Sequence, residues 1–278
     1  MPVRKIIACL LLAGFLAAPL PAQTQTQTQT MTRAQIDEML SVIDDPGFID
    51  RLVAQMSMPP NVRPHAATHL RAIWANRDFR NQVVDELARN QAILTDATGA
   101  LSGERLQEFT ALVTETLFSN GLQAMPAADI RSFLELSARI LRQLETDDCI
   151  AIASGRLSAT RTQALEMQGL GSFPDHDIAR YFQLLRAGVL AAVTNASPGP
   201  RLTASQEDFA ERALGGAMDA AISKHRDAAQ LGAALMSMEN PRTAHHCEIV
   251  IMVIEESARL QGHVGDWTVR WFAQGMAQ

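Results

Sequence analysis

Apolar residues recur at three- and four-residue spacing from Thr32 to the C-terminus, whereas the strict alternation that marks β-strands is nearly absent. This spacing puts the apolar side chains of a segment on one face of an α-helix. The segment after Thr32 shows it with Ile36, Met39, Leu40 and Ile43. The pattern therefore predicts an all-α protein of roughly a dozen short helices joined by short loops.

Capping and turn residues mark several predicted helix ends. Thr32-Arg33-Ala34-Gln35 has the form of a capping box. Asp45-Pro46 is typical of an N-cap followed by proline at the first helical position. Asn120-Gly121 predicts a left-handed stop, and Ser154-Gly155 predicts a helix end. Gly215-Gly216, inside a helical pattern, predicts a close approach of two helices.

The other predicted helices follow the same pattern and are separated by proline, glycine or asparagine. They include segments after Phe48, Pro64, Phe79, Ser102 and Pro126, the ranges 149–153 and 158–167, Pro174 to Val193, a segment after Thr203, the ranges 231–238 and 243–260, and a last helix from Asp266. Such helices can close as one irregular multi-helix bundle or stack in pairs as an α-solenoid. Because the chain shows no self-similarity of fixed period, we favour the irregular bundle.

Residues 1–22 have the three parts of a secretory signal peptide. Arg4 and Lys5 make the N-terminus basic, residues 6–20 are apolar, and Ala22 is a small residue suited to cleavage. The apolar stretch is short for a membrane span, which needs about 20 residues. We therefore expect export and cleavage, with no stable membrane span after cleavage.

Other interpretations of this N-terminus remain open. They are an uncleaved signal anchor, a lipid anchor on Cys9 and an alternative start at Met31. Residues 23–30 read QTQTQTQT, without apolar or charged side chains, and are expected to form a flexible linker. Residues 31–278 are then one helical domain, with a possible subdivision at 195–201, the turn-rich NASPGPR.

The charge of the chain argues against a nucleic-acid partner. It carries 24 basic and 30 acidic residues, for a formal net charge of −6, and loss of Arg4 and Lys5 with the signal gives −8. A general nucleic-acid binder needs clustered Lys and Arg to neutralise phosphates. Nearly all the basic residues are arginine, which together with the signal indicates a Gram-negative bacterium and a periplasmic or secreted location.

Cys149 and Cys247 are the two cysteines that remain after signal removal. An even pair in an oxidising compartment predicts a disulfide. The bond would join residues 98 positions apart, and the loop-entropy relation gives about 4–5 kcal/mol for such a loop. Two independent buried thiols are the alternative.

Four histidines are weak candidates for metal ligands. His65 and His69 can share one helix face, but Ala66 stands where the metalloprotease helix has its glutamate. His245 and His246 are consecutive, so their side chains point about 100° apart on a helix and do not converge. We therefore expect no metal. The first pair is interpreted as surface residues and the second as a polar cap region.

Catalytic and cofactor motifs are missing from the chain. It contains no GxSxG, GxxxxGK[S/T], GxGxxG or CxxCH sequence. Adjacent Glu255 and Glu256 suggest at most a glycosidic hydrolysis of cell wall, since paired acids perform that chemistry. We expect no cofactor and favour a protein that is not an enzyme. A metal-binding protein and a cell-wall-directed hydrolase are the alternatives.

Two features bear on binding. Trp267 and Trp271 are four residues apart beside Phe272, which predicts a docked C-terminal helix, with a partner- or membrane-facing helix as the alternative. Met236 and Met238 lie near a predicted helix end, and methionine adapts to varied surfaces. We expect an adaptor, chaperone-like or structural protein with a protein partner in the cell envelope.

Overall fold

A computed structural model describes residues 31–45, 47–91, 103–194, 200–238 and 241–276. These residues form 13 α-helices and one 3₁₀ helix, with no strand among them, so the expected all-α class is confirmed. The predicted signal and linker, 1–30, lie outside the described residues. The helices are α2 (Arg33–Leu40), η2 (Ser41–Asp44), α3 (Phe48–Gln55), α4 (Arg63–Trp74), α5 (Arg77–Arg89), α7 (Gly103–Leu122), α8 (Ala127–Leu141), α9 (Thr146–Ala153), α10 (Ala159–Leu170), α11 (Asp175–Val193), α12 (Ala204–Ser223), α13 (Ala228–Met236), α14 (Ala244–Arg259) and α15 (Gly262–Met276).

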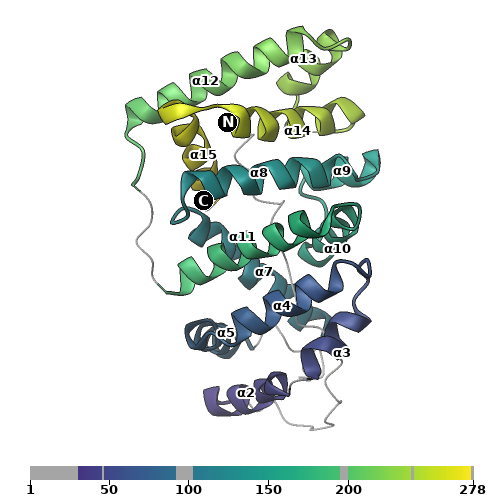
Figure 1. Ribbon diagram of the computed structural model, residues 1–278, viewed down its shortest axis with the longest axis vertical. Helices are drawn as coiled ribbons and strands as arrows, with labels where there is room; N and C mark the ends of the chain where they lie inside the picture. The colour runs from purple at the N-terminus through teal and green to yellow at the C-terminus, as the bar shows by residue number, and fades with distance from the viewer. Residues whose placement is uncertain (1–30, 46, 92–102, 195–199, 239–240, 277–278) are drawn as a thin grey trace.

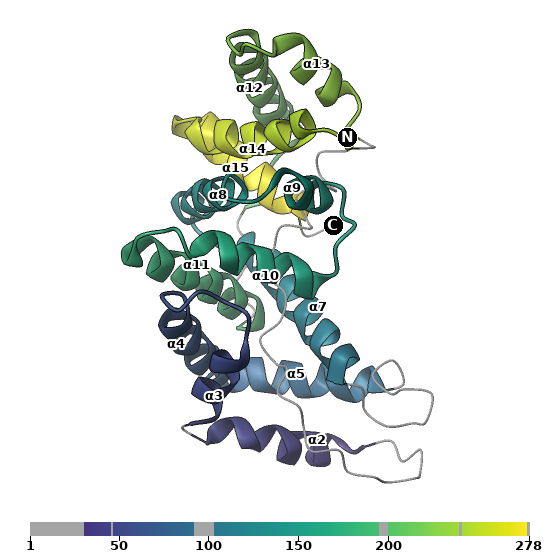
Figure 2. The same ribbon diagram turned by 90° about the vertical axis from the view of Figure 1, so that its right-hand side faces the viewer.

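The helices are stacked along the long axis of the molecule, with α2 at one end and α12 and α13 at the other (Figures 1 and 2). We call α12 and α13 the end layer. Helix α11 lies against α4 and α7, and α8 lies against α14 and α15. Helix α12 packs on α14 and α15 although it precedes both in the chain. In a solenoid each repeat contacts only its chain neighbours, so this crossed order is that of an irregular bundle.

Capping residues begin two helices as predicted. In α2 the Thr32 hydroxyl accepts a hydrogen bond from the Gln35 N–H, and the Gln35 side chain accepts one from the Thr32 N–H. Thr203 and Gln206 form the same reciprocal box at the start of α12. These boxes satisfy backbone donors that have no partner within the helix.

Two predicted helix starts are displaced. Helix α3 begins at Phe48, with Gly47 as its N-cap. Asp45 does not cap it, because its carboxylate accepts a hydrogen bond from the Gly47 N–H at 3.0 Å and so forms a tight turn before the helix. Helix α15 begins at Gly262 rather than Asp266, since Gly262 has a φ of 66° and makes the turn earlier.

Asn120-Gly121 does not end its helix, contrary to the prediction. Gly121 lies inside α7, where a β-carbon would overlap the carbonyl oxygen of Gly188 on α11. A β-carbon on Gly188 would lie 2.6 Å from the Phe118 ring. Glycine is needed at both positions because the two helices touch there. Gly155, in contrast, has a φ of 62° and follows the end of α9 as predicted.

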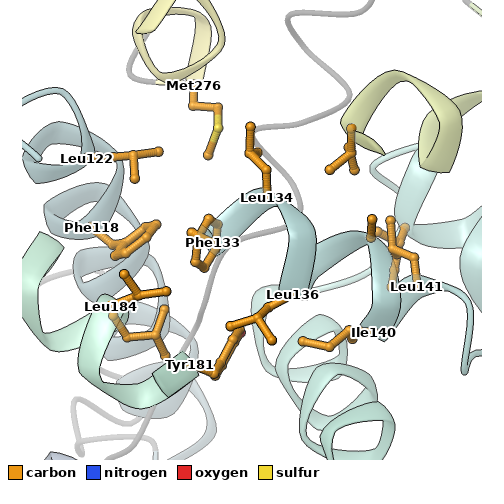
Figure 3. Close-up of a cluster of buried hydrophobic side chains, with 14 of the residues drawn as sticks. Phe118, Leu122, Phe133, Leu134, Leu136, Ile140, Leu141, Tyr181, Leu184 and Met276 are labelled. Carbon is orange, nitrogen blue, oxygen red and sulfur yellow. The ribbon is translucent and has the colours of Figure 1, made fainter. Parts of the chain in front are cut away.

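Aromatic side chains fill the space between α7, α8 and α11, which we call the central core (Figure 3). The ring centroids of Phe118 and Phe133 are 4.9 Å apart, and Phe133 stacks on Tyr181 at 6.0 Å. Met276 of α15 lies over the same cluster near Leu134 (Figure 3). All five side chains are buried, so the core joins the C-terminal helix to the middle of the chain.

The C-terminal helix is docked, as predicted. Trp271 and Phe272 of α15 are buried, and Trp267 is half-buried. At the start of the helix, Arg131 of α8 donates to the carboxylate of Asp266 at 3.0 Å. Apolar burial and this ion pair together hold α15 against α8.

Candidate functional site

Cys149 of α9 and Cys247 of α14 form the predicted disulfide, with their Cα atoms 5.7 Å apart. This separation is ordinary for a disulfide. Each cysteine lies near the start of its helix, and both are buried. The bond ties α14, on which the end layer rests, to the middle of the chain.

The structure does not bring His65 and His69 to a common site. Nε2 of His65 lies 2.7 Å from Oδ1 of Asp175 on α11. His69 is only 2% exposed, its Nδ1–H donates to the Phe182 carbonyl at 3.2 Å, and its ring centroid lies 5.3 Å from that of Phe182. The interpretation of both as surface residues is wrong for His69, which belongs to the packing of α4 on α11.

His69 is neutral in the folded protein. Burial lowers its pKa to about 3, the hydrogen bond to Phe182 opposes that shift, and the charge of Arg186 lowers the pKa further. Desolvation penalises the charged imidazolium, so the ring remains uncharged at pH 7. It serves as a buried hydrogen-bond donor.

His245 is half-buried, whereas His246 is 5% exposed. Nδ1 of His246 accepts a hydrogen bond from the Thr243 N–H at 3.2 Å and completes a capping box at the start of α14. Its Nε2 lies 3.2 Å from the Ser237 hydroxyl. The interpretation as a polar cap region is confirmed for His246.

Neither a metal cluster nor a membrane span is found in the part of the chain that the structure describes. Within those residues, no group of three or more His, Cys, Asp and Glu side chains is arranged to hold a metal ion. None of the helices described there has the length and hydropathy that a bilayer crossing requires.

Glu255 and Glu256 are held by arginines. Nε of Arg142 lies 2.7 Å from Glu255, and its Nη2 lies 3.3 Å from Glu248. Arg259 pairs with both Glu255 and Glu256. The hydrogen bond to Glu255 raises the pKa of Arg142. The pairs of Arg142 bridge the end of α8 to α14.

A buried polar cluster on α10 was not foreseen from the sequence. Thr162, Gln163 and Glu166 are 6%, 4% and 3% exposed. The Tyr181 hydroxyl donates to Glu166 at 3.5 Å, and burial, followed by the charge of Glu166, raises the pKa of Tyr181 well above its usual value. The phenol therefore stays protonated. All members of the cluster are buried, so it offers no exposed reactive group.

No helix of the described residues covers the outer side of the end layer (Figures 1 and 2). Helix α13 has no charged residue, and Ala229, Ala233 and Met236 are exposed on it. These residues, spaced by four and three positions, share one helix face and are called the α13 stripe. Met236 is 87% exposed, the highest value among the large apolar side chains that are exposed in the described residues.

Helix α12 contributes a second uncovered face. Phe209 is 49% exposed, its ring centroid lies 6.3 Å from that of Trp267, and the Arg212 guanidinium lies 4.9 Å from its centroid. Phe209 points about 100° away from its buried neighbour Ala210 and so lies outside the buried side of this helix. The buried side has a strict four-residue spacing and consists of Ala210, Leu214, Met218 and Ile222.

The predicted close approach at Gly215-Gly216 is not made within the chain. Apart from its chain neighbours and the backbone of α12 itself, no heavy atom of the described residues lies within 4 Å of a β-carbon built on either glycine. Both residues are exposed on α12. Gly121 and Gly188 of the central core also lie inside helices but touch a neighbouring helix, whereas Gly215 and Gly216 lie on α12 at the end of the stack.

Comparison with known proteins gives no relative for the chain. No protein family matches it, and searches of curated proteins and of solved structures find no significant match.

Proposed function

We propose that the protein is exported and acts by binding a protein partner in the cell envelope through the α13 stripe. The observation that carries the proposal is the 87% exposure of Met236 on a helix without charged residues. Exposed apolar side chains on an uncharged helix lose unfavourable contact with water when a partner covers them.

The chemistry of the stripe favours an apolar helix as the partner segment. Ala229 and Ala233 are small, so another helix can pack close to α13. Met236 has a flexible and polarisable side chain that fits differently shaped apolar surfaces. The partner would therefore present an amphipathic helix whose apolar side lies across this stripe.

Export is supported by two independent features. The Cys149–Cys247 disulfide is the form that cysteine pairs take in oxidising compartments. Residues 1–22 have the composition of a secretory signal, with Arg4 and Lys5 before an apolar stretch. Both fit a periplasmic or secreted location.

Site-specific photo-crosslinking in intact cells tests the binding role. A photoreactive amino acid is placed at Met236, and the matched control carries it at Leu112, which is 56% exposed on α7. We expect one protein to be crosslinked from position 236 and not from 112. Met236→Glu should abolish co-purification of that protein, whereas Leu112→Glu should not.

The proposal fails if position 236 yields no product, or the same products as position 112. It also fails if Met236→Glu leaves co-purification intact. Thermal unfolding of the purified variants separates loss of binding from loss of folding. Because Met236 is so exposed, we expect Met236→Glu to melt like the unchanged protein.

A further inference from the structure

The face of α12 that points away from the molecule is centred on Gly216. The buried side, from Ala210 to Ile222, is on average opposite to Gly216 at about 100° of rotation per residue. Gly216 is exposed, and a β-carbon there would meet no heavy atom within 4 Å. Glycine disfavours a helix interior, so its presence here is not explained by the packing of α12 on its own chain.

Charged residues lie on one flank of this face. Nη1 of Arg212 lies 2.6 Å from the carboxylate of Asp208 one turn earlier. Asp219 is exposed, and the described residues offer it no ion-pair partner. Arg212 and Asp219 both lie on the same side of Gly216, at about 40° and about 60° around the helix. The flank therefore carries the Arg212–Asp208 ion pair before the glycine, with the Arg212 guanidinium also over the Phe209 ring, and after the glycine the Asp219 carboxylate, for which the described residues offer no ion-pair partner.

Apolar residues lie on the other flank. Phe209 is 49% exposed, and Ala220 is exposed on the turn after Gly216. They are rotated from Gly216 by about 20° and about 40° in the direction opposite to the charges. The flank thus has a large ring before the glycine and a small side chain after it.

We propose that this face binds a second copy of the chain, with the two α12 helices antiparallel and a two-fold axis between Gly215 and Gly216. Arg212 and Asp219 are equally far from that axis along the helix, so each Arg212 would lie opposite Asp219 of the second copy. On the other flank, Phe209 would lie near Ala220 of the second copy, offset from it by about 3 Å along the helix. Gly216 lies next to the axis, where the absence of a side chain lets the helices approach.

The charges and shapes favour a second copy over an unrelated partner because the face is complementary to itself. A two-fold interface uses the same surface on both chains, and each contact occurs twice. Opposite charges meet on one flank, and a large ring meets a small side chain on the other. A single pair of helices about 30 Å long makes a small interface, so we expect a Kd in the micromolar range.

Sedimentation velocity over a dilution series of the purified protein tests the proposal. We expect a reversible monomer–dimer equilibrium. Gly216→Gln should raise the dimer Kd by about tenfold or more, because a side chain at the crossing separates the helices. The matched control is Gly215→Gln, which has equal open space but points about 100° away from Gly216. This control should leave the Kd within about threefold.

A charge exchange tests the register. Asp219→Arg and Arg212→Asp should each weaken self-association by about tenfold or more, since like charges then face each other twice. An equimolar mixture of the two variants should form a heterodimer, because both cross-chain pairs are then of opposite charge. Glu38→Arg, an exposed acid on α2 at the other end of the molecule, should leave self-association unchanged.

Three results would overturn the proposal. The first is a chain that stays monomeric up to about 100 µM, well above a micromolar Kd. The second is a dimer that is equally stable, or equally lost, in Gly216→Gln and Gly215→Gln. The third is a pair of charge variants that do not associate when mixed. Met236→Glu should still dimerise, so failure of this proposal and failure of the proposed partner site are distinguishable.

Discussion

Two pairs of glycines show how the central core and the end layer differ. Gly121 and Gly188 lie where α7 touches α11, and a methyl group on either would strike the neighbouring helix backbone or the Phe118 ring. Gly215 and Gly216 lie on α12 with open space around them. Neighbours within the chain explain glycine in the core. In the end layer no neighbour among the described residues explains the glycines, so we infer that another molecule contacts this face.

The two regions also differ in how they are buried. The core contains aromatic rings enclosed on all sides by α7, α8 and α11 (Figure 3). Helix α12 buries a single row of side chains, from Ala210 to Ile222, and leaves its other side exposed. Burial of apolar area is the main favourable contribution to folding, so the core should be the more stable region.

The largest expected effect comes from removing the disulfide that links α14, which supports the end layer, to α9 in the middle of the chain. Replacing both Cys149 and Cys247 by alanine removes a cross-link between residues 98 positions apart. We expect the free energy of unfolding to fall by about 4 kcal/mol, because the unfolded chain gains loop entropy. Urea unfolding of the unchanged and doubly substituted proteins measures the difference. A loss below about 1 kcal/mol would mean that the bond contributes little to joining the regions.

The second-largest expected effect is the loss of stability from a substitution at a glycine of the central core. Gly188→Ala places a β-carbon 2.6 Å from the Phe118 ring, and the packed neighbours cannot move far. We expect a loss of about 3 kcal/mol in the free energy of unfolding. Chemical denaturation measures it. Unchanged stability would show that α7 and α11 separate easily, and that the core is less tightly packed than described.

Acid should weaken the packing of α4 against α11 through His69. The unfolded chain takes up a proton at the ordinary pKa of 6.5, whereas folded His69 does so only near a pKa of about 3. Because the unfolded chain binds the proton more readily, the contribution of neutral His69 to the free energy of unfolding is complete above pH 6.5 and is lost as the pH falls. At pH 5 we expect a loss of about 2 kcal/mol from this residue. Unfolding at pH 7 and pH 5 measures it, and His69→Gln should lack that share of the pH dependence.

The smallest expected effect is an increase in the free energy of unfolding. Gly215→Ala on α12 meets no atom within 4 Å and replaces glycine by the best helix former. At concentrations where the chain is monomeric, we expect the free energy of unfolding to rise by about 0.5–1 kcal/mol. A loss comparable to that of Gly188→Ala would remove the contrast between the two regions.

Local signals in the sequence predicted much of the fold. The capping box at Thr32 and the helix start at Thr203 depend on residues within one turn, and the helical spacing of apolar residues depends only on the backbone period. The disulfide followed from an even cysteine count and the expected compartment. Such features do not require knowledge of which helices meet.

Features that depend on which helices meet were missed. Asn120-Gly121 has the sequence of a helix stop, but the contact with Gly188 makes it part of a helix crossing. The sequence indicated a surface position for His69, but α11 covers this residue in the structure. The exposed Phe209 could have been suspected from its place one residue before the four-residue spacing that begins at Ala210. The sequence of this chain does not show which segment of a partner would bind the α13 stripe.

Hydrogen–deuterium exchange at two protein concentrations tests most directly whether a second chain covers the exposed face of α12 in the end layer. At about 100 µM, compared with about 1 µM, amides of α12 should exchange more slowly, because dimers protect that helix. Amides of α11 in the central core should exchange at the same rate at both concentrations. Exchange of α12 that does not depend on concentration, or equal slowing in α11 and α12, would contradict the account.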